Sequence, residues 1–222
     1  MPHNEEYLKA KELKERRERH GAYRTSCLQC EECPALVISR KKAPWGKPTY
    51  GYGNIDSQVM FVGEAPGRDG CATTGIPFTR DRSGELYNWV LKYLGYTLED
   101  VYTTNIVKCW PADSNENNRT PTDDECHNCF NHLLNEIRIV RPAIIVALGR
   151  TPERILRRYQ RNNPNMAVLQ VPIEYIPHPA FILRNGGYPG TDTARVYTRK
   201  FAKFLGDKGS SKQEDLRNFF TG

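Results

Sequence analysis

One acidic residue stands directly after a short apolar run, at a point where a strand would end. Residues 59–62 are VMFV, and residues 63–67 are GEAPG, which places Glu64 between the apolar run and a Pro-Gly turn. An apolar run bounded by turn-forming residues predicts a buried strand followed by a sharp turn. Because ligands bind outside the carboxyl ends of strands in open α/β sheets, Glu64 is a candidate catalytic carboxylate. The same pattern also suits an ordinary loop acid, so Glu64 needs partners from elsewhere in the chain.

The seven cysteines form a second group with chemical potential. An odd number of cysteines, in a chain whose charged N-terminus resembles no export signal, argues for metal ligation or free thiols and against a disulfide framework. The candidates are two overlapping C-x-x-C units, one cysteine after an expected strand, and two cysteines on the following helix: Cys27, Cys30, Cys33, Cys109, Cys126 and Cys129. Four thiolates suit an iron–sulfur cluster or a structural zinc, and spacing does not separate the two. Buried cysteines without a metal are the alternative.

Strands that alternate with helices must position these residues. Apolar and β-branched runs predict strands over 59–62, 101–107 and 143–148, with one or two short strands over 168–176. Helical patterns cover 4–20, 85–94, 123–140, 151–159 and 192–205. Thr122 and Glu125 have the spacing of a capping box at the start of the third of these helices. The alternation predicts an α/β fold with a mainly parallel sheet covered on both faces.

Length and charge limit the organisation of the chain. The 222 residues suffice for one core, and we expect a peripheral helix within 1–24, a single domain over 25–206 and a polar tail over 207–222. The thin apolar stripe of the first helix favours a solvated helix over a DNA-contacting arm. A formal net charge of +6 tolerates a polyanionic partner without establishing one. With no apolar run of ~20 residues, we expect no membrane span and a location in the cytosol or nucleoid.

Several motifs, taken together and in order, resemble the iron–sulfur uracil-DNA glycosylases of families 4 and 5. The likeness extends over residues 30–185. The segments CxxCPAL from Cys30, WGKP, GYGN and GIPFTRDRSGELY (75–87) resemble family 5. The segments GEAPG (63–67), TNIVKC (104–109), NRTP (118–121) and HP (178–179) with LRN (183–185) resemble family 4. The loop between Gly67 and Gly75 and the segment 186–194 depart from the family 4 pattern, so the range of bases is less constrained than the fold.

The resemblance implies a three-layer α/β/α sandwich that flips uracil out of DNA and hydrolyses its N-glycosidic bond, leaving an abasic site. It also implies a structural [4Fe-4S] cluster on Cys30, Cys33, Cys109 and Cys129, with Cys27 and Cys126 as spare thiols. The expected partner is uracil-containing DNA, single- or double-stranded. We expect a monomer in a prokaryotic cytoplasm.

The same resemblance assigns roles within the site. Glu64 would orient the attacking water, and His178 would stabilise the departing base through uracil O2. Phe78 would stack on the base, and the backbone N–H groups around Gly63 to Ala65 would share the stabilisation of the departing base with His178. The amide of Asn105 offers one donor and one acceptor, which match O4 and N3–H of uracil and mismatch cytosine.

Four residues are expected to hold the DNA. Ser83 and Gly84, at a helix start, suit a phosphate. Leu183 resembles a DNA-penetrating wedge, and Arg184 would contact a phosphate. Two alternatives remain: a glycosylase for hypoxanthine or another deaminated base, and a non-enzymatic nucleic-acid-binding module held together by metal.

Overall fold

A mixed sheet of five strands forms the centre of the computed structural model, which describes residues 2–206 and residue 208. The strand order is β1-β3-β2-β4-β5. The strands are β1 (Tyr52–Gly53), β2 (Val59–Gly63), β3 (Tyr102–Asn105), β4 (Ile144–Leu148) and β5 (Ile173–Ile176). β1 pairs with β3 in the antiparallel sense, and the other pairs are parallel. The register sets Gly63 opposite Asn105 and Leu148 opposite Ile176, so four parallel strands end at one edge.

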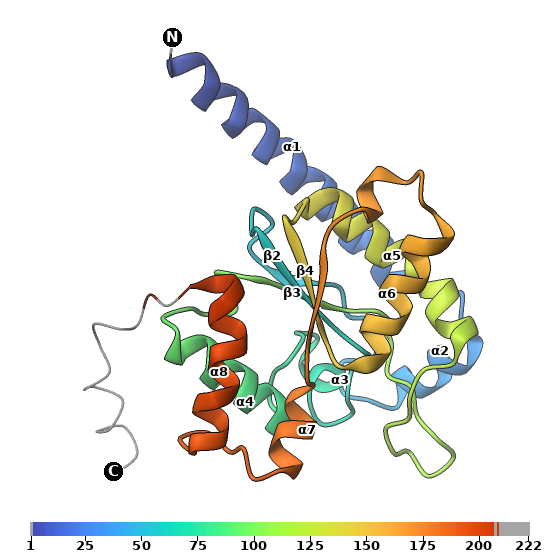
Figure 1. Ribbon diagram of the computed structural model, residues 1–222. Helices are drawn as coiled ribbons and strands as arrows, with labels where there is room; N and C mark the ends of the chain where they lie inside the picture. Colours follow the sequence, from blue (N-terminus) through green and yellow to red (C-terminus); the bar gives the residue numbers. More distant parts are fainter. Residues whose placement is uncertain (1, 207, 209–222) are drawn as a thin grey trace.

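Helices cover both faces of the sheet (Figure 1). Alternate residues of β2 face the two helical layers. Met60 and Val62 pack with α5 (Asp123–Val140) and α6 (Arg150–Asn162). Val59 and Phe61 point the other way and pack with α4 (Arg82–Tyr93) and α8 (Asp192–Leu205). This alternation follows from the period of two along a strand. The predicted three-layer α/β/α sandwich is confirmed.

The structure confirms most of the predicted elements and adds short ones. α5 has the predicted bounds, and its capping box between Thr122 and Glu125 is present. Residues 168–176 contain a 3-10 turn (Ala167–Leu169) and a single strand, β5. Three short helices carry no clear periodic signal and were not predicted: α2 (Pro34–Lys41), α3 (Cys71–Thr74) and α7 (Pro179–Arg184). None of the described helices is long and apolar enough to cross a membrane.

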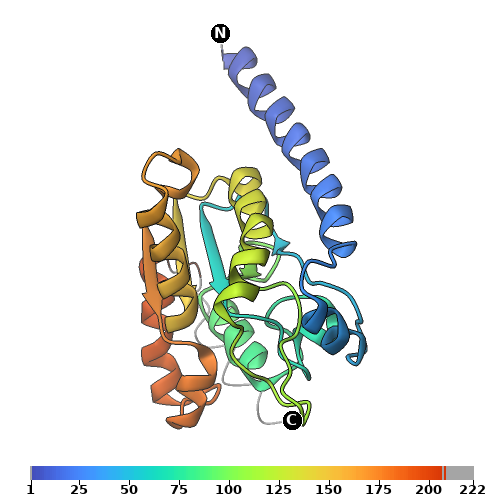
Figure 2. The same cartoon turned by 90° about the vertical axis from the view of Figure 1, so that its right-hand side faces the viewer.

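The first helix, α1 (Pro2–Leu28), is longer than the predicted 4–20 and is not simply solvated. Its N-terminal part projects from the body of the molecule, whereas its later turns run beside α5 (Figures 1 and 2). The buried Arg16 joins the two helices by donating from Nε to Ile139 O (2.6 Å) and from Nη2 to Val140 O (2.7 Å). A guanidinium suits this position because the last carbonyls of a helix lack intrahelical donors. The polar tail expected over 207–222 lies outside the described residues, apart from residue 208.

Candidate active site and cysteine cluster

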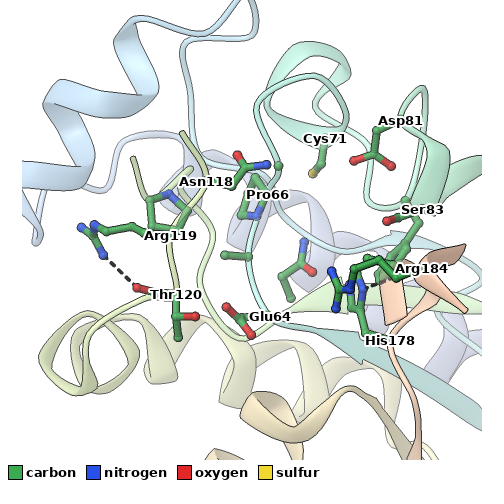
Figure 3. A pocket seen from close by; sticks show the side chains of 16 residues that line it. Glu64, Pro66, Cys71, Asp81, Ser83, Asn118, Arg119, Thr120, His178 and Arg184 are labelled. Atoms are coloured by element: carbon green, nitrogen blue, oxygen red, sulfur yellow. Dashed lines mark hydrogen bonds between the residues drawn. The ribbon is translucent and has the colours of Figure 1, made fainter. Parts of the chain in front are cut away.

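A cavity of about 440 Å³ opens at the carboxyl edge of the sheet. Glu64 follows β2, Asn105 ends β3 and His178 follows β5, and all three line this one cavity. In Figure 3, Glu64 lies between Thr120 on one side and His178 on the other, with Arg184 beside the imidazole. Three candidate residues far apart in sequence therefore meet because parallel strands end together.

Asn105 presents an unused amide to the cavity. The residue is only 4% exposed, and its carboxamide forms no hydrogen bond with any group in the described part of the chain. Because the amide faces the cavity and has no protein partner, its donor and its acceptor are both available to a ligand. Gly63 makes room for it, since a Cβ there would lie 2.3 Å from Asn105 Oδ1 and 2.8 Å from the Phe78 ring. Gly63 thus lies behind the cavity wall and determines where the amide sits.

A buried ion pair holds the backbone carbonyl of Asn105. Lys108 Nζ donates to Asn105 O and to Glu136 Oε2, each at 2.7 Å. Lys108 is 1% exposed and Glu136 is fully buried. Glu136 also accepts from Tyr23 of α1 (2.8 Å) and from the Gly51 backbone (2.6 Å). Because a buried charge is tolerated only when paired and hydrogen-bonded, this network ties α1, α5 and the end of β3 together.

His178 is held as a neutral imidazole with a defined tautomer. Burial, together with the nearby charge of Arg184, lowers the pKa of His178 from 6.5 to about 4. Nδ1 accepts a hydrogen bond from Ala180 N at 3.1 Å, where His178 caps α7. With Nδ1 acting as the acceptor, the single proton of the neutral ring lies on Nε2. The ring can therefore donate one hydrogen bond to a ligand without bringing a positive charge.

Phe78 is buried and adopts a backbone conformation that non-glycine residues rarely take, with φ +53°. Its ring centroid lies 5.6 Å from that of His178. Asn88 on α4 donates from Nδ2 to Phe78 O (2.7 Å) and to Gly84 O (2.8 Å). A Cβ at Gly84 would lie 2.7 Å from the Phe78 carbonyl. The hydrogen bond from Asn88 stabilises the strained Phe78, and the absence of a side chain at Gly84 leaves room for its carbonyl.

Most predicted site residues gather at the cavity, and a few do not. Those that line it are Glu64, Ala65, Phe78, Ser83, Asn105, His178 and Arg184. Gly63 and Gly84 lie behind it. The structure does not bring Leu183 to the cavity, because this half-buried side chain packs against the core formed with α4 and α8. Phe181, on the same short helix, is instead 52% exposed.

Sequence reasoning missed Asp81 and Asn88. Asp81 lines the cavity and accepts from Gly84 N (2.8 Å) as the N-cap of α4, and burial raises its pKa. An acid before a helical run is a recognisable cap signal that could have identified Asp81. Asn88 carries no such signal, since its role depends on the fold of the preceding loop.

Four of the seven cysteines face a second, smaller pocket. Cys30, Cys33, Cys109 and Cys129 line it, whereas Cys27 packs with Tyr23 and Ile139. Cys126 does not line this pocket.

Donors surround the sulfur atoms of this pocket. Arg40 Nη1 lies 3.3 Å from Cys109 Sγ, the Lys108 backbone N lies 3.2 Å from Cys129 Sγ, and Asn128 Nδ2 lies 3.7 Å from Cys33 Sγ. Within the described residues, no three Cys, His, Asp or Glu side chains are arranged to hold a single metal ion. Four thiols with N–H donors at three sulfurs nevertheless suit thiolates that share a larger group.

Comparison with known proteins identifies the family of this chain. Residues 50–202 match the uracil DNA glycosylase superfamily. A type-4 uracil-DNA glycosylase of Thermotoga maritima is 37% identical over 164 residues, covering 71% of this chain and 79% of that protein. One of Archaeoglobus fulgidus is 43% identical over 123 residues, covering 55% of this chain and 56% of the relative. A type-5 uracil-DNA glycosylase of Pyrobaculum aerophilum is 34% identical over 145 residues, covering 55% and 62% respectively.

Proposed function

The chain belongs to the uracil DNA glycosylase superfamily, and we propose that the cavity shared by Glu64, Asn105 and His178 is where it removes uracil from DNA. Its relatives are named uracil-DNA glycosylases, and this similarity indicates that the protein is a DNA-repair enzyme of the same class. The observation that carries the assignment to this cavity is that Glu64, the neutral imidazole of His178 and the amide of Asn105, which has no hydrogen-bond partner in the described part of the chain, line the same cavity.

Asn105 reads the base in this proposal. Its Nδ2 donates to uracil O4 and its Oδ1 accepts from N3–H, so both unused groups find partners at once. In this orientation of the amide, cytosine presents an amino donor to Nδ2 and an unprotonated N3 to Oδ1, which leaves both pairs mismatched. A buried site built for one hydrogen-bond pattern rejects the other strongly, because its polar groups would stay unpaired.

Glu64 and His178 divide the hydrolysis between them. As the N-glycosidic bond breaks, the sugar becomes cationic and the base becomes an anion with charge on O2. Glu64 orients the water that adds to the sugar carbon, stabilises the positive charge and accepts the proton that this water loses, and the remaining hydroxyl becomes part of the abasic site. His178 donates from Nε2 to O2. A neutral donor suits this role because it keeps its proton on the ring. The released uracil anion takes its proton from solvent.

Phe78 forms the stacking wall, with its ring tilted towards His178. Ser83 and Arg184 lie at the cavity and are suited to the phosphates that flank the flipped nucleotide. We expect the protein to act as a monomer on single- or double-stranded DNA in a prokaryotic cytoplasm.

The pocket of four cysteines is the proposed site of a [4Fe-4S] cluster. A single ion requires its thiolates ~2.3 Å from one centre, whereas a cluster distributes four cysteines over four irons and keeps the sulfurs further apart. When bound, the cluster would act as a structural crosslink between the N-terminal segment, the end of β3 and α5.

An excision assay with a matched carboxylate control tests the function. Glu64→Ala should reduce release of free uracil from a synthetic duplex at least ~100-fold, corresponding to ~3 kcal/mol of transition-state stabilisation, with DNA binding retained. Glu85→Ala, at an exposed acid on α4, should leave release unchanged. Equal activity of wild type and Glu64→Ala would contradict the role of Glu64. Hypoxanthine duplexes measured in parallel would reveal the alternative base, if they were the better substrate.

A further inference from the structure

The cations of α6 are all arginines, and four of them share one face of the helix. Arg150, Arg154, Arg157 and Arg161 follow the i, i+4, i+7, i+11 spacing of one stripe. They line a shallow groove of about 360 Å³. We call these four residues the arginine stripe.

The acids near the arginine stripe do not neutralise it. Two carboxylates each serve two arginines: Glu153 pairs with Arg150 (2.9 Å) and Arg157 (3.2 Å), and Asp123 pairs with Arg154 (3.2 Å) and Arg158 (2.9 Å). Arg161 forms no hydrogen bond or ion pair with the described part of the chain. The face therefore keeps a surplus of positive charge, unlike a solvated helix whose charges alternate in sign.

The stripe begins beside the cavity. α6 starts directly after Gly149, where a Cβ would lie 3.3 Å from the Cβ of His178. The opposite face of α6 is anchored by the buried Ile155 and Leu156, so the arginines project from a fixed helix. Eleven residues at 1.5 Å each give the stripe a length of ~16 Å. Phosphates of one DNA strand follow each other every ~3.4 Å along the axis, so the stripe can reach several of them.

We propose that the arginine stripe binds the sugar–phosphate backbone of the DNA outside the cavity. The identification of DNA as the polyanion rests on the proposed function. Guanidinium groups suit phosphates because their planar donors match two oxygens at once. Backbone contacts carry no sequence information, but they fix the position of the protein on DNA. The stripe would thus help to hold the damaged strand in register with the pocket.

The salt dependence of binding to a uracil-free duplex tests the stripe separately from excision. A plot of the logarithm of the association constant against the logarithm of the salt concentration has a negative slope, and each phosphate contact contributes ~0.9 to its magnitude. The double substitution Arg154→Gln/Arg161→Gln should therefore reduce the magnitude of this slope by ~1.8. Arg154→Lys/Arg161→Lys should retain the wild-type slope, because the charges remain. The control is Arg195→Gln/Arg199→Gln, which removes two exposed arginines of α8 on the other face of the sheet. The control should also keep the wild-type slope.

Three outcomes decide the matter. A smaller slope only in the α6 glutamine variant supports the proposal. An unchanged slope would overturn it and would leave the stripe to another partner, such as an acidic protein. Equal losses in the α6 and α8 variants would also overturn it, because they would reflect total charge alone. Failure of wild type to release uracil from a short oligonucleotide would contradict the proposed function while leaving the slope result intact.

Discussion

The depressed pKa of His178 predicts a measurable loss of stability in mild acid. The folded protein holds the imidazole neutral down to about pH 4, whereas the unfolded chain takes up the proton at about 6.5. Stability linked to His178 is therefore fully present above pH 6.5 and is lost progressively between 6.5 and 4 as the pH falls. Between pH 7.5 and pH 5 the linkage relation gives a loss of ~2 kcal/mol. Contact of the ring with water in the cavity makes this value an upper limit.

The measurement compares wild type with His178→Gln, which keeps a hydrogen-bonding side chain but cannot titrate. Denaturant unfolding at pH 7.5, 6 and 5 gives the free energy of unfolding for both proteins. Every other titratable group is common to the two, so the difference isolates His178. Wild type should lose up to ~2 kcal/mol more than the variant over this range. Parallel losses in the two proteins would refute the neutral imidazole, and so would a ¹⁵N NMR spectrum at pH 7 with protons on both ring nitrogens.

Further substitutions test the other parts of the site. Asn105→Asp removes the donor to uracil O4 and should reduce uracil release ~100-fold, since an unpaired buried polar group costs ~2–3 kcal/mol; undiminished release would contradict base reading by this amide. If the proposed cluster is present, the purified protein should be brown and contain iron; Cys129→Ser should abolish the colour and most of the iron, whereas Cys126→Ser should keep both, as measured by absorbance and iron analysis. The reverse result would make Cys126 the ligand in place of Cys129. Phe181→Ala should slow excision from duplex DNA more than from single-stranded DNA, because Phe181 is the exposed apolar side chain of α7. If Leu183→Ala changed the ratio of the two excision rates more than Phe181→Ala does, Leu183 would be the residue that penetrates the duplex.

The strands and long helices were predictable because their signals are local. The apolar run before Glu64 and the capping box at Thr122 follow from period and spacing alone, and both are present in the structure. Asn105 and His178 were predicted from the family resemblance, and their position beside Glu64 agrees with the rule that parallel strands end at one edge.

The rest could not be predicted because it depends on packing between distant segments. Nothing in the local pattern of α7 indicates that the half-buried Leu183 packs against the core while Phe181 is exposed. The support of Phe78 by Asn88 arises only once the loop has adopted its left-handed turn. Likewise, the thin apolar stripe of α1 did not predict the contact of Arg16 with the end of α5. That contact is polar, and its partners lie more than 120 residues away.

The attachment of α1 to α5 through Arg16 has a consequence for the order in which a nascent chain can fold. The carbonyls that Arg16 binds belong to Ile139 and Val140, so they leave the ribosome long after the helix that needs them. Until then α1 lacks the surface of α5 beside which its later turns lie. A helix near residue 16 therefore depends on residues more than 120 positions later in the chain before its contact with α5 is complete.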